Sequence, residues 1–126
     1  MAKGLITIVG LDPIGIALAQ AVKQARPNAL VAGVDADPRR VQAALKETPL
    51  DRNDTNLAAA ARDADLIILN VPPSELRAAF KLISPNVRDG AVVLDLTPIK
   101  AAVQDWAAEF LPSTVRHMSC HLVLHP

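Results

Sequence analysis

The sequence predicts an α/β protein: a doubly wound, mostly parallel sheet of five to six strands flanked by helices. Two observations carry this prediction. Short apolar runs alternate along the chain with segments of helical periodicity, which is typical of strand–helix–strand units. The first apolar run ends in a glycine turn, Gly10-x-Asp12-x-x-Gly15, and a helical segment follows at once. A parallel sheet of this kind brings the carboxyl ends of its strands, and any ligand site, to one edge.

The composition favours one cytoplasmic domain. The 126 residues, 51% of them apolar, are enough for one buried core. Zero net charge and an aromatic content of one Trp and two Phe argue against nucleic-acid binding. The single Cys120 excludes an internal disulfide, and no apolar run approaches the ~18 residues of a membrane span. We therefore expect neither a nucleic-acid nor a membrane partner.

The first half of the chain shows two strand–helix pairs. The expected elements are a strand over Leu5–Val9, a helix over Pro13–Gln24, a strand over Ala29–Val34 and a helix over Arg39–Glu47. Both helices begin with an Asp–Pro pair, in which Asp is the N-cap and Pro takes the first helical position. The helical spacing places Ile14 on the inner face of the first helix.

The second half repeats the alternation less regularly. The polar stretch 48–56 holds at most a short third strand. The remaining elements are a helix over Leu57–Ala64, a strand over Leu66–Val71, a helix capped by Ser74, a strand over Ala91–Leu94, a helix started by Thr97-Pro98 and a possible sixth strand in Thr114–Ser119. We expect Thr97 to cap the fifth helix and Ile99 to lie on its inner face.

The glycine turn is one residue short of the G-x-G-x-x-G dinucleotide fingerprint. Gly10 permits a sharp turn off the strand, and Gly15 permits close packing of the helix. The middle position normally lets the backbone approach a pyrophosphate, which binds the free N–H groups of the helix. Asp12 stands there instead, and its carboxylate occupies those donors and repels a phosphate. A simple strand–turn–helix explains the same residues without a cofactor.

Further polar residues stand at the ends of the other strands. Asp35 can accept both hydroxyls of an adenosine ribose and repels a 2′-phosphate, which favours NAD over NADP. Arg39 or Arg40 either lies over the adenine, meets a 2′-phosphate or is an exposed helix charge. After the fourth strand comes Asn70-Val71-Pro72-Pro73, whose proline pair forms a stiff wall beside a ribose or nicotinamide, or merely ends the strand.

Three histidines, His117, His121 and His125, are spaced four residues apart near the end of the chain. On a helix they would form one stripe and could bind zinc. The β-branched composition favours a strand, on which they are too far apart for one ion. We therefore expect no metal site, and one histidine to transfer a proton at the nicotinamide end.

These stretches resemble the N-terminal NAD(P)-binding Rossmann domain of prephenate and arogenate dehydrogenases. The matching stretches are IVGLDPIGIALA, VDADPRRVQAAL, ADLIILNVPPSEL, DGAVVLDLTPIK and the histidine-rich end. The family counterparts look like IVGLGLIGGSLA, an Asp-containing strand end, ADLVVLAVPP, DVGSVK and a GGHPMAG-like loop. The chain departs from them at Asp12, at Pro98 in place of the serine of DVGSVK, and throughout the GGHPMAG loop. Thr97 is a possible substitute for that serine.

The resemblance implies a cofactor domain of an oxidoreductase that oxidises prephenate by hydride transfer. The candidate cofactor-binding residues are Gly10, Leu11, Asp12, Pro13, Ile14, Gly15, Asp35, Arg39, Val71, Pro72 and Thr97. It also implies a catalytic histidine that accepts the hydroxyl proton. Alignment with the GGHP loop without gaps places this histidine at His121, whereas alignment of the His-Pro pair of that loop with His125-Pro126 places it at His125. The helical second domain, which in the family supplies much of the substrate site and the dimer interface, is absent from these 126 residues.

Residues 1–126 are therefore expected to bind NAD but not to catalyse the reaction alone. The expected partners are a small carboxylate substrate, for which Lys100 is a candidate contact, and a second copy bound mainly through the absent domain. Two alternatives stay open. The chain is a binding or interaction module with weakened dinucleotide affinity, or it is the cofactor domain of a β-hydroxyacid dehydrogenase or imine reductase, which share the first half of the pattern.

Overall fold

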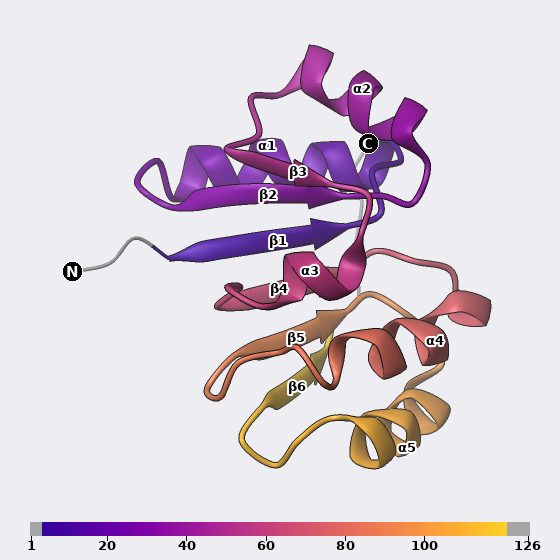
Figure 1. The fold of residues 1–126 in the computed structure, drawn as a ribbon. Coiled ribbons are helices and arrows are strands. Elements are labelled where there is room, and N and C mark those ends of the chain that lie inside the picture. Colours follow the sequence, from indigo (N-terminus) through magenta and orange to yellow (C-terminus); the bar gives the residue numbers. More distant parts are fainter. Residues whose placement is uncertain (1–3, 121–126) are drawn as a thin grey trace.

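The computed structural model describes residues 4–120 and contains one six-stranded sheet in the order β3-β2-β1-β4-β5-β6. All five strand pairs are parallel, so the arrowheads in Figure 1 point the same way. The predicted doubly wound α/β fold is confirmed. The elements are β1 (Leu5–Val9), α1 (Pro13–Ala25), β2 (Leu30–Val34), α2 (Pro38–Glu47), β3 (Arg52–Asp54), α3 (Leu57–Ala61), β4 (Leu66–Leu69), α4 (Pro73–Ile83), β5 (Val92–Asp95), α5 (Lys100–Phe110) and β6 (Arg116–Ser119).

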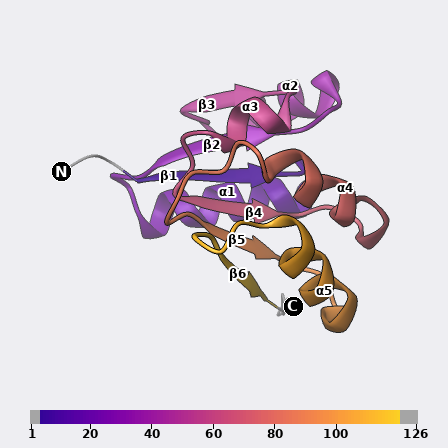
Figure 2. The ribbon, with the colours of Figure 1, turned by 60° about the horizontal axis from the view of Figure 1, so that its bottom comes forward.

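The helices cover the two faces of the sheet in two sets. Figure 1 shows α1 behind the sheet and α3, α4 and α5 in front of it, and the turned view in Figure 2 agrees. Each set encloses its own buried cluster. Ile16 of α1 and Val41 of α2 pack on one face, whereas Phe80 of α4 and Val103 of α5 pack on the other. Burial of these apolar faces is the main stabilising term of the fold.

The three central strands, β2, β1 and β4, bring their carboxyl ends together at one edge of the sheet. β1 pairs with β2 on one side and with β4 on the other, and the chain reverses its winding direction between β1 and β4. Two backbone hydrogen bonds continue the pairing past the strand ends, from Gly10 N–H to Val34 O and from Asn70 N–H to Val9 O, each 2.8 Å long. The carboxyl ends of three strands are therefore held together at the point where doubly wound sheets bind ligands.

The structure contradicts four sequence-based predictions, two about helix caps and two about side chains expected on the inner face of a helix. α4 begins at Pro73 without a side-chain cap, so the prediction that Ser74 caps it is wrong: Pro73, with its fixed φ, already takes the first position. α5 begins at Lys100, so Thr97 is not its cap, and Ile99 is 51% exposed rather than on the inner face. Ile14 is 38% exposed because Gly15 and Ile16 form the buried side of the first turn.

The short third strand and the sixth strand are both present. Within residues 4–120, no helix is both long enough and apolar enough to cross a membrane.

Candidate nucleotide-binding site

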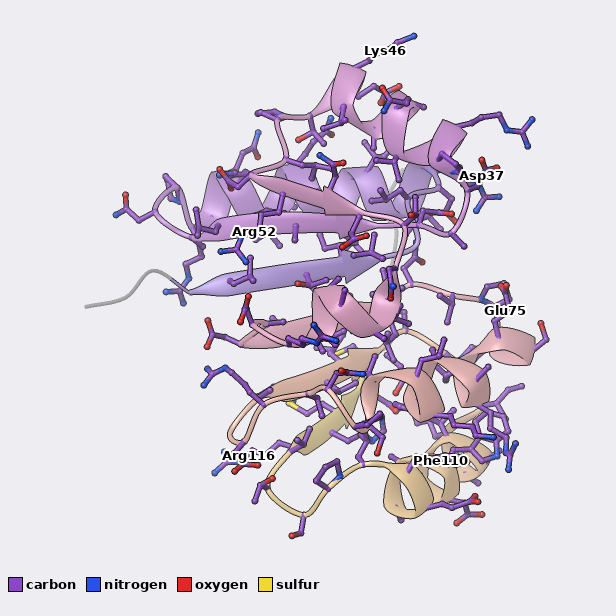
Figure 3. The ribbon with its side chains drawn as sticks, in the orientation of Figure 1. Asp37, Lys46, Arg52, Glu75, Phe110 and Arg116 are labelled. Carbon is purple, nitrogen blue, oxygen red and sulfur yellow. The ribbon has the colours of Figure 1, made fainter. Side chains whose placement is uncertain are left out.

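A cleft of about 710 Å³ opens at the carboxyl edge of the sheet. Pockets of this size hold nucleotide-sized ligands. The cleft is surrounded by the carboxyl ends of β1, β2 and β4, by the chain from the end of β3 into α3, and by one side of α4. Its lining comprises Val9, Gly10, Val34, Asp35, Ala36, Arg40, Thr55, Asn56, Leu57, Ala58, Asn70, Val71, Pro72, Ser74, Glu75, Ala78, Ala79 and Leu82. Figure 3 shows Asp37 and Glu75, which begin the α2 and α4 regions, on this same side of the molecule.

The two glycines of the turn are required by close packing. Gly10 has a φ of +98°, and a Cβ there would lie 1.9 Å from the Asn70 carbonyl oxygen. A Cβ on Gly15 would lie 1.8 Å from the Gly10 carbonyl oxygen. Side chains cannot approach backbone atoms so closely, so the turn after β1 needs glycine at both positions to lie against the chain that leaves β4. The glycines are therefore explained by the fold itself.

Asp12 fills the anion position at the start of α1 with its own carboxylate. Its Oδ1 accepts a hydrogen bond from the Gly15 N–H at 2.9 Å and from the Asn70 side-chain amide at 2.8 Å. The same amide nitrogen donates to the Gly10 carbonyl oxygen at 3.1 Å. The sequence predicted the cap and placed Asn70 at the same edge of the sheet, but it did not predict their contact, which forms because β4 lies beside β1.

Asp35 lies beside the same turn, bonded to the backbone N–H of Leu11. It is 9% exposed, and it lines the cleft. Its Oδ2 accepts from the Leu11 N–H at 2.9 Å, and its Oδ1 accepts from the Asp37 N–H at 2.9 Å. The Leu11 side chain is 2% exposed and belongs to the core under α1, so only its backbone contributes to the site. Carboxylate oxygens carry further lone pairs for hydroxyl donors.

The two arginines of α2 have different surroundings. Arg40 lies 3.7 Å from Asp35 and lines the cleft. The Arg39 side chain is 91% exposed and pairs with Asp37, with its Nε 3.2 Å from Oδ1. Arg39 is not among the residues that line the cleft, so Arg40 is the arginine in position to meet a ligand there. Successive helical residues are rotated by about 100°, which separates the two.

The Arg39–Asp37 pair gives a test of this placement. The side-chain hydrogen bond from Arg39 lowers the pKa of Asp37 below its ordinary value, and the backbone N–H of Arg39 adds to the effect. Arg39→Ala should therefore raise the pKa of Asp37 toward its ordinary value, measured by an NMR titration of its carboxyl carbon. Because the pKa of Asp37 is lower in the folded than in the unfolded chain, ionised Asp37 stabilises the fold at pH values above its unfolded-state pKa. This stabilisation is lost as the pH falls through the folded-state pKa. An unchanged pKa would contradict the pairing.

The chain after β4 forms the wall opposite Asp35. Val71 and Pro72 line the cleft, whereas Pro73, the second proline of the predicted wall, begins α4 and is not part of the lining. Pro13 and Ile14 lie at the exposed start of α1 and are not part of the lining. Thr97 is 4% exposed beneath the β5 end, where its N–H donates to Asp95 at 3.1 Å, and it is also outside the cleft.

A second polar cluster lies at the β5 and β6 ends. Asp95 is completely buried, and its Oδ2 is 2.6 Å from His117 Nε2 and accepts from the Ser119 hydroxyl at 2.8 Å. The His117 ring meets the Phe80 ring edge-on at a centroid distance of 5.5 Å. The sequence predicted His117 only as one of three histidines, any one of which could transfer a proton, and did not pair it with Asp95. The signal it lacked is the strand register, which pairs Val93 with His117 and Asp95 with Ser119.

The two candidate catalytic histidines, His121 and His125, lie outside the described residues. Within residues 4–120, no three His, Cys, Asp or Glu side chains are grouped so that they could hold a metal ion.

Comparison with known proteins decides the family. Residues 18–124 match the family model described as the nucleotide-binding domain of prephenate dehydrogenase. The chain belongs to this family. The match to the prephenate dehydrogenase model begins inside α1 and leaves out the glycine turn that holds Asp12.

Curated relatives agree with this assignment. The chain is 25% identical over 120 residues to prephenate dehydrogenase of Bacillus subtilis, covering 94% of the chain and 32% of the relative. It is 28% identical over 120 residues to a probable arogenate/prephenate dehydrogenase of Methanocaldococcus jannaschii, covering 94% and 26%. The chain therefore spans about a third or less of the length of these prephenate dehydrogenases.

Solved structures share the fold. Prephenate dehydrogenase of A. aeolicus, in complex with hydroxyphenyl propionate and NAD+, superposes with a TM-score of 0.81 at 20% identity, covering 91% of this chain and 41% of that one. Arogenate dehydrogenase of Synechocystis gives a TM-score of 0.72 at 23% identity, covering 84% and 37%.

The residues of this prephenate dehydrogenase domain fit one half of a dinucleotide better than the other. An adenosine is matched by a hydroxyl acceptor, Asp35, and by the apolar wall of Val71 and Pro72. A pyrophosphate is not matched, because the Asp12 carboxylate already accepts the Gly15 N–H that would face it.

Proposed function

We propose that this chain is the cofactor half of an NAD-dependent dehydrogenase, and that it holds the adenosine part of NAD in the cleft beside β2 and β4. The observation that carries the proposal is the Asp35 carboxylate, which is nearly buried, fixed by two backbone N–H groups and part of the cleft lining. In this role Asp35 accepts the ribose hydroxyls, and NAD, when bound, supplies the hydride acceptor. The expected NAD binding is measurable but weak, because Asp12 opposes the pyrophosphate.

The same carboxylate supports a preference for NAD over NADP. A 2′-phosphate would stand beside Asp35, where two negative charges repel. Arg40, 3.7 Å away, neutralises only part of this repulsion because it is mostly exposed. We expect NAD to bind at least about tenfold more tightly than NADP, equivalent to about 1.4 kcal/mol.

Isothermal titration of both cofactors into Asp35→Asn tests this preference. The variant keeps an acceptor oxygen for the Leu11 N–H but removes the charge, so the difference between NAD and NADP should shrink to less than about threefold. Asp37→Asn removes one neighbouring charge outside the cleft lining and should leave the preference unchanged. Equal affinity of NAD and NADP for the unmodified chain would overturn the assignment of Asp35.

The proposal extends to the rest of the reaction. A histidine that follows β6, His121 or His125, would accept the hydroxyl proton, and Lys100 at the start of α5 would contact a small carboxylate substrate. A second, helical domain would complete the substrate site and form a homodimer. The size of the relatives supports this extension, since each is about three or more times as long as the chain.

A further inference from the structure

The first turn of α1 has few donors left for a phosphate. Helix N-termini bind phosphate through backbone N–H groups that have no partner within the helix. Here Pro13 has no N–H, and the Gly15 N–H donates to the Asp12 side chain at 2.9 Å. The Ile16 N–H donates to the Asp12 carbonyl oxygen at 3.0 Å. Three of the first four helical residues therefore offer no donor to a ligand.

The Asp12 carboxylate is fixed in this position. The Asn70 amide donates to Asp12 Oδ1 and to the Gly10 carbonyl oxygen, and both of these atoms accept hydrogen bonds only. Asn70 follows β4, so the carboxylate is tied to a second strand as well as to its own helix. A phosphate that took the place of the carboxylate at the Gly15 N–H would have to break both hydrogen bonds that the carboxylate accepts.

The charge around the cleft also disfavours an anion. Asp35 and Glu75 line it, and the Asp12 carboxylate, although outside the lining, accepts a hydrogen bond from Asn70, which belongs to the lining. Arg40 is the cation among the lining residues, and it is paired with Asp35 at 3.7 Å. Two lining carboxylates, the neighbouring Asp12 carboxylate and one guanidinium leave an excess of negative charge around the cleft, and this repels phosphate and attracts cations.

We propose that the cleft prefers adenosine-type nucleosides whose 5′ substituent carries no negative charge over nucleotides and dinucleotides. This inference rests on the proposed function for its adenosine subsite. Asp35 accepts the N–H of Leu11, the residue before Asp12, and Asn70, which lines the cleft, donates to the Asp12 carboxylate. We therefore place the 5′ side of a ribose held by Asp35 toward that carboxylate. The 5′ position then meets a carboxylate where other domains of this fold offer free N–H groups. A neutral or cationic 5′ group is compatible with it.

Isothermal titration with adenosine, AMP, NAD and 5′-amino-5′-deoxyadenosine tests the proposal on the whole chain. We expect adenosine to bind at least about tenfold more tightly than AMP, and the cationic amine to bind more tightly than adenosine. In Asp12→Gly, AMP and NAD should gain at least about tenfold, whereas adenosine changes less than about threefold. Asp105→Asn, at an exposed position of α5, removes one negative charge elsewhere and should reproduce the unmodified affinities.

Asp12→Asn is the second variant, because it keeps a cap oxygen for the Gly15 N–H and so protects the fold if Asp12→Gly unfolds. It should abolish the advantage of the cationic amine. Equal affinity for adenosine and AMP in the unmodified chain, with NAD bound as well, would overturn this inference and leave the proposed function standing. Absence of binding by all four ligands, in the unmodified chain and in Asp12→Gly, would overturn the proposed function itself.

Discussion

Gly10→Ala is expected to cost at least about 3 kcal/mol of unfolding free energy and to leave little folded protein, because two penalties coincide at this residue. The φ of +98° is unfavourable for any residue with a Cβ, and the added Cβ would lie 1.9 Å from the Asn70 carbonyl oxygen. The obstacle is backbone, so it cannot rotate away as a side chain could. Urea unfolding followed by circular dichroism measures the loss.

Alanine substitutions at two other glycines measure the backbone-conformation penalty and the steric penalty separately. Gly90 also has a positive φ, +83°, but a Cβ there would have nothing within 4 Å, so Gly90→Ala should cost only about 1–2 kcal/mol. Gly15→Ala has ordinary helical geometry and a Cβ 1.8 Å from the Gly10 carbonyl oxygen, which isolates the steric penalty. If the Gly10→Ala variant were no less stable than the Gly90→Ala variant, this would contradict the close contact between the Gly10 turn and the backbone of Asn70 after β4.

Asp95→Ala is expected to destabilise the domain by about 3 kcal/mol or more. The change leaves three buried or half-buried groups without their acceptor: the Thr97 N–H, the His117 ring and the Ser119 hydroxyl. Asp95 is completely buried, so water cannot easily replace the lost oxygens. The effect should appear in urea unfolding and as a displaced His117 ring signal in NMR spectra.

Asp89→Ala is the matched control. Asp89 is exposed and accepts a single hydrogen bond, from the Thr114 hydroxyl at 2.7 Å, so its loss should cost less than about 1 kcal/mol. A double-mutant cycle of Asp95→Ala with His117→Ala then isolates the pair. Additive effects in that cycle would show that the carboxylate and the imidazole do not interact in solution.

The sequence was sufficient to predict what depends on local pattern. Apolar runs of four to six residues ending in Gly10, Asp35 or Asp95 indicated parallel strands, and parallel strands bring their ends together whatever the side chains between them. The Asp12-Pro13 pair likewise indicated a capped helix, because a cap involves only its own first turn. The cleft position of Asp35 follows from these two points.

Contacts that depend on register or on helix rotation were beyond sequence reasoning. The bond from Asn70 to Asp12 joins residues 58 positions apart, and the pair His117–Asp95 joins residues 22 apart. Each requires one pairing register of neighbouring strands, which the apolar runs leave undetermined by two residues or more. The choice between Arg39 and Arg40 depended in the same way on the rotation of α2.

The strand order has a consequence for synthesis. β1 is made first but lies in the middle of the sheet, and its edge opposite β2 is covered only when Ile6 pairs with Leu66, 60 residues later. Until then the nascent chain presents an unpaired, apolar strand edge, which is a template for intermolecular association. Late parallel pairing of this kind is also slow. The interval before Leu69 leaves the ribosome is thus the period in which a growing chain most needs protection from aggregation.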